Sequence, residues 1–152
     1  MLSEGDPAPD FELESDDGET VRLSDLRGTQ VVLYFYPKDD TPGCTTQACG
    51  VRDAWGEFEQ AGAVVLGVSP DSVSSHAKFK ERYGLPFRLL ADSDHAVADE
   101  YGVWGEKKFM GRTFMGVSRS TFVIAEDGTL KRVMHDVKPD THADQVLETL
   151  RS

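Results

Sequence analysis

The chain contains little cysteine, with only Cys44 and Cys49 among its 152 residues. A gap of four residues and no second cysteine pair is a poor pattern for zinc. The spacing also differs from the Cys-x-x-Cys motif of thioredoxin-type dithiol reductases, in which two residues separate the cysteines. Four histidines show no ligand-like spacing, and we expect each at the surface or at a helix end: His76, His95, His135 and His142. The sequence therefore predicts no metal site.

Basic residues and long apolar runs are also scarce. Lys and Arg total 16 against 27 Asp and Glu, a net charge of -11. Such a surface repels phosphate backbones and anionic membranes, which argues against nucleic acid or lipid as a partner and suits a small neutral substrate or a protein with basic rim residues. No apolar run approaches the ~20 residues of a membrane helix. The segment 1–6 lacks the positive start and apolar core of a signal peptide, so we expect a cytoplasmic protein.

The chain shows no repeat, linker or low-complexity segment, which predicts a single domain over residues 1–152. Apolar runs bounded by turn residues predict strands at 11–13, 20–23, 31–36, 64–68, 89–91, 120–125 and 129–135. Helices are predicted at 24–28, from about 44 to 61, from a Ser74 or Ser75 cap to Gly84, at 94–101 and at the C-terminus. A glycine-rich stretch, 102–116, separates the helix at 94–101 from the strand at 120–125. This order predicts an α/β fold in which helices flank a central mixed sheet, behind an N-terminal β-hairpin.

The segment around Cys44 carries the strongest chemical signal. A buried strand, 31–36, is followed by the chain-breaking residues Pro37, Pro42 and Gly43, and a helix begins near Cys44. A cysteine at a helix start lies among unpaired N–H groups and the positive end of the helix dipole, which favours thiolate over thiol. Such a thiolate attacks a peroxide oxygen and becomes a sulfenic acid. A buried structural cysteine is the alternative interpretation, and this context makes it the weaker one.

Cys49 offers a second thiol that can condense with the sulfenic acid to form a disulfide. Five residues along an ideal helix separate the two Cα atoms by about 8–9 Å, whereas a disulfide requires less than ~7 Å. The first turns of the helix must therefore distort before the bond forms. Gly50 weakens the helix by about 1 kcal/mol relative to alanine and favours that distortion.

Three further residues are candidates for the same site. Thr41 precedes Cys44 by three residues and carries a hydroxyl that hydrogen-bonds sulfur or a ligand oxygen. Arg119 precedes a predicted strand, so its guanidinium leaves a rigid element and could supply the fixed cation that a thiolate needs. By spacing alone, a surface salt bridge is the more frequent role for such an arginine. Arg52 lies eight residues beyond Cys44, too far along the helix axis to be its first partner.

These residues resemble a known family. The pattern Pro37-x-x-x-Thr41-x-x-Cys44 is similar to the active-site signature of the peroxiredoxins. The run 41–46 followed by Cys49 resembles the subgroup called bacterioferritin comigratory proteins, or Q-type peroxiredoxins. Segments similar to that subgroup also occur at 5–11, 101–107 and 119–124, so the resemblance covers nearly the whole chain.

The resemblance implies a thioredoxin-like fold and a thiol peroxidase that needs neither haem nor metal. It implies that Cys44 is the peroxidatic cysteine and Cys49 the resolving one, and that hydrogen peroxide and organic hydroperoxides are substrates. Thr41 would orient the peroxide, Pro37 would shield the pocket, and Arg119 would activate the thiolate. Thioredoxin or a glutaredoxin-like donor would reduce the disulfide, and a monomer or weak dimer is expected.

One residue departs from the pattern, because many members carry glutamate where this chain has Gln47. Glutamine brings no negative charge near Cys44, so we expect no loss of activity. Two other functions stay open: a redox sensor whose Cys44–Cys49 disulfide switches a protein partner, and an inert scaffold. An apolar group in the glycine-rich stretch is either a surface for organic substrates or ordinary packing, with packing favoured: Phe109, Met110, Phe114 and Met115.

Overall fold

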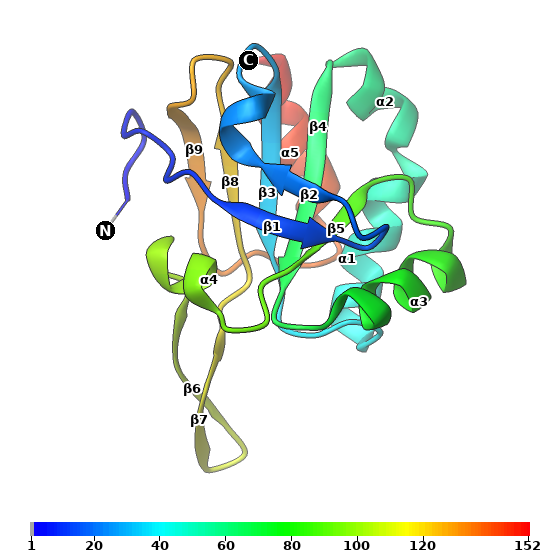
Figure 1. Ribbon diagram of the computed structural model, residues 1–152, viewed down its shortest axis with the longest axis vertical. Coiled ribbons are helices and arrows are strands. Elements are labelled where there is room, and N and C mark those ends of the chain that lie inside the picture. Colours follow the sequence, from blue (N-terminus) through cyan, green and yellow to red (C-terminus); the bar gives the residue numbers. More distant parts are fainter. Residues whose placement is uncertain (1) are drawn as a thin grey trace.

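The structure is a computed structural model that describes residues 2–152. Its centre is a seven-stranded mixed sheet in the order β2-β1-β5-β4-β3-β8-β9 (Figure 1). The strands are β1 (Glu12–Ser15), β2 (Thr20–Arg22), β3 (Gln30–Phe35), β4 (Ala63–Ser69), β5 (Arg88–Ala91), β8 (Ser120–Ile124) and β9 (Leu130–Met134). The helices are α1 (Pro42–Asp53), α2 (Trp55–Gln60), α3 (Val73–Tyr83), α4 (Ala96–Glu100) and α5 (His142–Arg151), with a 3-10 turn η1 (Leu23–Leu26).

Strand β3 lies in the interior of the sheet, and this explains its continuous apolar sequence. It pairs in parallel with β4 and antiparallel with β8, where Phe35 is opposite Ser120. A strand with neighbours on both edges and side chains buried on both faces carries apolar residues at every position. The pairing also brings the end of β3 beside the start of β8, and the site described below lies there.

The two faces of the sheet have separate cores, since successive side chains of a strand point to opposite sides. On one face, Val32 and Tyr34 pack with Ala48 of α1, Phe58 of α2 and Leu147 of α5. On the other face, side chains of β3 and β8 pack with α4 and with the N-terminal segment: Val31, Leu33, Phe35, Phe122, Val97, Tyr101 and Phe11. Figure 1 shows α1 and α5 behind the sheet and α4 in front of it. Helices on both sides of a mixed sheet confirm the predicted fold class.

The predicted N-terminal hairpin is present as β1 and β2, in which Leu13 lies opposite Val21. It does not stand apart from the sheet, because β1 also pairs antiparallel with β5. The extension therefore adds two strands to one edge of the central sheet.

Two expectations about local structure were wrong. The helix expected from 44 to 61 is two helices that meet at Ala54, where Trp55 turns inward and its ring lies 6.0 Å from that of Phe87. The helix expected to start at Ser74 or Ser75 is capped by Ser72, whose hydroxyl accepts from the Ser75 N–H. The glycine-rich stretch, for which the sequence predicted no strand, forms a two-stranded hairpin, β6 (Trp104–Phe109) and β7 (Arg112–Val117), because Gly111 takes the positive φ of 77° that its turn requires.

None of the helices within residues 2–152 combines the length and the apolar character that crossing a membrane would need.

Candidate active site

Cys44 occupies the third position of α1, and its side chain is buried, with 2% of the residue exposed. Thr41 is the N-cap residue and Pro42 starts the helix, a position where the missing N–H of proline costs nothing. The first N–H groups of a helix have no partner within it. Cys44 therefore lies at the N-terminal end of a helix dipole, as its sequence context predicted.

Arg119 is the cation nearest to Cys44 in the site. Its Nη2 donates to the Cys44 Sγ at 3.4 Å, and its Nη1 donates to the Gln47 Oε1 at 2.5 Å. Within residues 2–152, Arg119 takes part in none of the ion pairs, which makes the surface salt bridge the wrong interpretation. Because its second partner is a neutral amide, the positive charge of Arg119 acts on the sulfur without a competing carboxylate.

The backbone around Arg119 is held on both sides. Its carbonyl accepts from the Val137 N–H at 3.1 Å, and the preceding residue, Ser118, donates its N–H to the Val103 carbonyl at 2.8 Å. The guanidinium also lies close to Gly43, where an added Cβ would be only 3.0 Å from Nη2. A glycine at this position of α1 thus leaves room for the arginine that faces Cys44.

Thr41 and Pro37 belong to the loop between β3 and α1, and both are half-buried. The Thr41 hydroxyl donates to the Lys38 carbonyl at 2.8 Å, and its own carbonyl accepts from the Thr45 N–H at 2.8 Å. The hydroxyl oxygen keeps lone pairs free to accept a further hydrogen bond. The structure thus places Thr41 at the entrance of α1, one turn from the sulfur.

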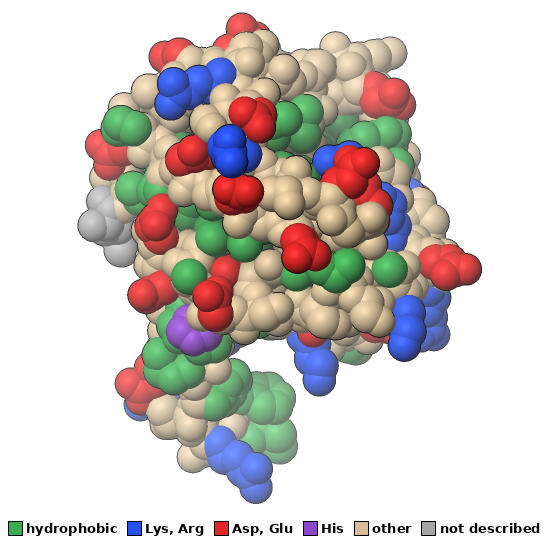
Figure 2. Space-filling view, in the orientation of Figure 1, with side chains coloured by type: hydrophobic (Ala, Val, Ile, Leu, Met, Phe, Trp, Pro, Cys, Tyr) green, Lys and Arg blue, Asp and Glu red, His purple; other side chains and the backbone are tan. Residues whose placement is uncertain are grey.

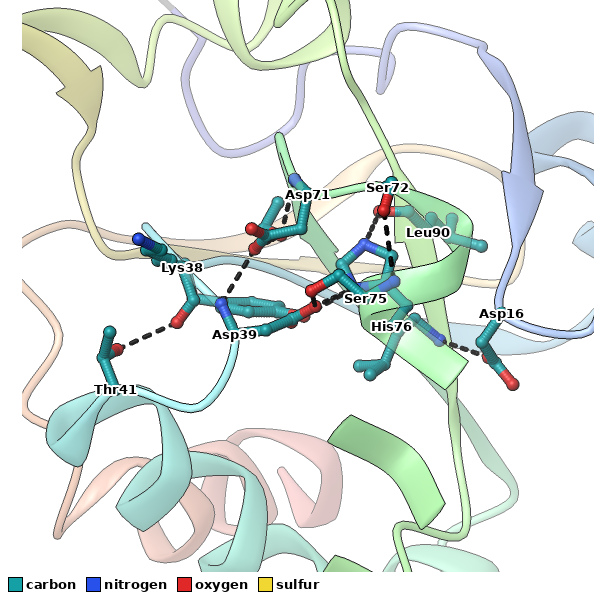
Figure 3. A network of polar contacts seen from close by, with 12 residues as sticks. Asp16, Lys38, Asp39, Thr41, Asp71, Ser72, Ser75, His76 and Leu90 are labelled. Atoms are coloured by element: carbon teal, nitrogen blue, oxygen red, sulfur yellow. Dashed lines mark hydrogen bonds and ion pairs between the residues drawn. The ribbon is translucent and has the colours of Figure 1, made fainter. Parts of the chain in front are cut away.

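The loop is anchored by Asp39, which is buried and contacts the start of α3 (Figure 3). Its carboxylate accepts from the Tyr36 hydroxyl at 2.6 Å and from the Ser75 hydroxyl at 2.8 Å. Its backbone N–H donates to the Asp71 Oδ2 at 2.8 Å. Since Asp39 lies two residues before Thr41, these bonds fix the position of the active-site loop.

His76 completes this anchor and is fully buried, so the expectation of a surface or helix-end histidine was wrong for it. Its Nε2 lies 2.9 Å from the Leu90 carbonyl, which only accepts, so Nε2 carries a hydrogen. Its Nδ1 lies 2.7 Å from the Asp39 Oδ2. No spacing signal in the sequence links His76 to the loop, because α3 reaches Asp39 only through the fold.

Asp39, Asp71 and His76 bring three ligand-type atoms within 4.8 Å of one another, which the sequence did not predict. All three residues are already bonded to protein groups, Asp71 through the Ser69 hydroxyl at 2.6 Å. We therefore interpret the cluster as a structural anchor of the loop.

Cys49 lies in the same helix as Cys44, and both are free thiols. Cys49 is half-buried, and α1 is continuous through both cysteines from Pro42 to Asp53. Arg52 points away from the site, since its Nη1 donates to the Tyr83 carbonyl at 2.7 Å. The two sulfurs are therefore held in one intact helix.

Several buried polar atoms near Cys44 lack a hydrogen-bond partner within residues 2–152, among them Tyr34 Oη, Gln47 Nε2 and His142 Nδ1. Burial, and then the nearby Cys44, raise the pKa of Tyr34 well above its ordinary value. Burial, and then Arg119, lower the pKa of His142 to about 4. His142 is a helix-end residue as expected, but it is fully buried, and its Nε2 lies 2.8 Å from the Thr121 hydroxyl. Each buried group without a hydrogen-bond partner costs about 1–3 kcal/mol. In α1 this cost falls on the Gln47 side chain and lowers the stability of the first turns of the helix.

Residues 4–133 match the AhpC/TSA family. The chain belongs to this family. It is 51% identical to Peroxiredoxin Bcp of Bacillus subtilis over 147 residues, which cover 97% of this chain and 94% of that protein. Among crystal structures, a cysteine mutant of Xylella fastidiosa PrxQ superposes with a TM-score of 0.93 at 35% identity and covers 99% of this chain and 96% of that chain.

The bacterioferritin comigratory protein of Xanthomonas campestris, studied for its alkyl peroxide reduction activity, has a TM-score of 0.88 at 39% identity, over 93% of this chain and 90% of that chain. These similarities confirm the resemblance to the Q-type peroxiredoxins. The chain is thus a thiol peroxidase of the peroxiredoxin class.

Proposed function

We propose that this protein reduces hydrogen peroxide and organic hydroperoxides through Cys44, forms a Cys44–Cys49 disulfide, and is reduced again by a dithiol protein of the thioredoxin or glutaredoxin type. The observation that carries the proposal is the 3.4 Å contact between Arg119 Nη2 and Cys44 Sγ at the start of a helix that also holds Cys49. The alkyl peroxide activity of the Xanthomonas campestris relative supports organic hydroperoxides as substrates.

The proposed roles follow from the geometry. The Cys44 thiolate attacks one peroxide oxygen, the O–O bond breaks, and the alcohol or water leaves with a proton. Arg119 stabilises the negative charge on sulfur and on the departing oxygen, while the Thr41 hydroxyl binds the peroxide. Pro37 stiffens the loop beside the sulfur and excludes water.

The resolving step requires α1 to unwind, since an ideal helix holds the two Cα atoms about 8–9 Å apart. Two features support unwinding near Gly50: glycine weakens a helix by about 1 kcal/mol, and the buried Gln47 Nε2 gains a water partner when its turn opens. The anchored loop at Asp39 marks where unwinding would stop. Equal hydrogen exchange of residues 41–52 in reduced and oxidised protein would contradict this step.

We also propose a monomer or weak dimer in the cytoplasm, folded as one domain over residues 1–152. Two free thiols, one of them half-buried, suit a reducing compartment where protein disulfides are transient.

The experiment that tests the function is the intact mass and free-thiol count of reduced protein before and after one equivalent of hydrogen peroxide. We expect a loss of about two mass units and of both thiols within seconds. Cys44→Ser should consume no peroxide, whereas Cys49→Ser should form one sulfenic acid and then stall or over-oxidise. If both variants turned over like the parent protein, the proposal would fail.

A redox sensor is the second candidate, favoured by the four large apolar side chains that the structure exposes between residues 109 and 115. A sensor would bind a partner in only one redox state and turn over slowly. Steady peroxide consumption with a reductase distinguishes the enzyme from the sensor.

A further inference from the structure

The hairpin β6–β7 exposes four large apolar side chains that neither core cluster includes. Their exposed fractions are 68% for Phe109, 86% for Met110, 46% for Phe114 and 55% for Met115. We call these four residues the hairpin patch. The expectation that they pack inside the protein was wrong. The hairpin projects from the body of the molecule, and green apolar side chains cover much of it (Figure 1, Figure 2).

The hairpin also differs from the rest of the chain in charge. It carries three basic residues, Lys107, Lys108 and Arg112, and the single acid Glu106, whereas the whole chain has a net charge of -11. Charges more than about 8 Å away are screened at physiological salt, so a molecule at the projecting hairpin meets mainly its local positive charge. The acidic composition predicted a partner with basic rim residues, but this surface fits an acidic rim.

One face of the hairpin combines apolar and basic side chains. Residues directly opposite in an antiparallel pair share a face, and here Lys107 is opposite Phe114, and Phe109 is opposite Arg112. The Lys107 Nζ donates to the Val117 carbonyl at 2.8 Å, next to the start of the segment that leads to Arg119. Burial, and then the Arg119 charge, lower the pKa of Lys107, while Cys44 acts in the opposite direction.

The base of the hairpin is fixed to the body, since the Trp104 ring stacks on His95 with centroids 3.8 Å apart. The patch is therefore a rigidly based, projecting surface on a hairpin that ends two residues before Arg119. A surface of this kind differs from a pocket for an alkyl chain, which would bury most of its ligand. It suits a second protein, since projecting methionines adapt to different contacts, and redox partners bind through small interfaces.

We propose that Phe109, Met110 and Phe114 of the hairpin patch, with Arg112, form the docking surface for an acidic dithiol protein that reduces the Cys44–Cys49 disulfide. The inference rests on the proposed function. In the reaction, a partner thiolate attacks one sulfur of the disulfide, the S–S bond breaks, and the other sulfur leaves as a thiolate that takes up a proton. The second partner thiolate then attacks the mixed disulfide, so the partner leaves oxidised and both cysteines leave reduced.

The experiment compares a protein dithiol with a small one. Peroxide turnover is measured with thioredoxin plus its reductase and, separately, with dithiothreitol, for the parent protein and two variants, Phe109→Ser/Met110→Ser and Arg112→Glu. Lys78→Glu is the matched control, because Lys78 is exposed on α3 and undergoes the same change of charge. The variants change exposed side chains, and equal thermal unfolding midpoints establish that they fold.

We expect kcat/KM for thioredoxin to fall at least tenfold in the double serine variant and about threefold in Arg112→Glu, and to stay within twofold in Lys78→Glu. Turnover with dithiothreitol and the single-turnover oxidation by hydrogen peroxide should change less than twofold in all variants. Unchanged kcat/KM for thioredoxin would overturn the proposal, as would an equal fall with both reductants.

Two other ligands of the hairpin patch would give different results in these experiments. If only oxidation by cumene hydroperoxide falls, the patch binds organic substrates and the docking proposal is wrong. If instead the parent protein co-sediments with phosphatidylglycerol vesicles, the double serine variant does not, and thioredoxin kinetics are unchanged, the patch binds lipid. A parent protein that consumes no peroxide with dithiothreitol contradicts the proposed function itself, whereas one reduced by dithiothreitol but by neither thioredoxin nor glutaredoxin contradicts the docking partner.

Discussion

His142 should make the protein less stable as the pH falls from about 6.5 to about 4. Its ring is fully buried at the start of α5, against Tyr34, with ring centroids 5.4 Å apart. Burial and then Arg119 lower its pKa from 6.5 to about 4. A helix N-terminus also disfavours a positive ring. Because the unfolded chain takes up this proton at a higher pH than the folded chain, the unfolded state gains relative stability through that window.

The size of the effect follows from the two pKa values, 6.5 and about 4. Their difference of about 2.5 corresponds to about 3 kcal/mol once the pH is below both values. At pH 5 the loss should already be about 2 kcal/mol, and above pH 7 the group contributes nothing to the pH dependence. A domain of ordinary stability holds only about 5–15 kcal/mol, so this loss is readily measured.

The assay is urea unfolding at pH 7.5, 6, 5 and 4, for the parent protein and for His142→Gln. The carboxyl groups of the protein also titrate in this range. They are common to both proteins, so their effects cancel when the two unfolding free energies are subtracted. Loss of the Thr121 contact lowers the stability of the glutamine variant equally at every pH, and its curve should be flatter by about 2 kcal/mol between pH 7.5 and 5. Parallel curves for the two proteins would refute the reasoning.

Three predictions concern the reaction itself. Arg119→Met should slow the single-turnover oxidation of Cys44 by hydrogen peroxide about thirtyfold, or on the order of 2 kcal/mol after allowance for solvent screening, and an unchanged rate would remove Arg119 from the mechanism. Gly43→Ala should slow the same stopped-flow step about tenfold, because the new Cβ would lie 3.0 Å from the Arg119 Nη2 and displace the guanidinium. Gly50→Ala is its matched counterpart, since no neighbouring atom lies closer than 3.9 Å to its Cβ. It should leave oxidation unchanged but slow the formation of the disulfide with Cys49 about fivefold, because it stabilises α1 by about 1 kcal/mol, and equal effects of the two alanines on both steps would contradict the unwinding mechanism.

The active-site cysteine was predictable because its signals are local. The apolar run of β3, the prolines after it and the glycine before Cys44 all lie within a few residues, and each acts on the backbone where it stands. Arg119 was a candidate only because it precedes a strand, and its role in activating the thiolate came from the family resemblance. Its contact with Cys44 spans 75 positions of sequence and arises because β3 pairs with β8, which brings Ser120 opposite Phe35.

The buried histidines were missed for the same physical reason. Polar side chains at helical positions suit an exposed face, and nothing nearby in the sequence shows that His76 would meet Asp39, or His142 would meet Thr121. The four apolar residues of the hairpin patch were identified from the sequence as either a surface or ordinary packing. Packing was favoured, and the structure exposes them instead.

The sequence by itself therefore determined the strands of the central sheet and most of the helices, the helix-start position of Cys44, and the spacing that places Cys49 out of reach in an intact helix. These depend on backbone preferences and on periodicity, which act over a few residues. Only the tertiary structure decided which charges and buried rings surround the sulfur, how the loop is anchored, and that the glycine-rich stretch forms a hairpin that projects from the body. Those features depend on strand order and on contacts between distant segments, where burial and desolvation are set by the whole fold.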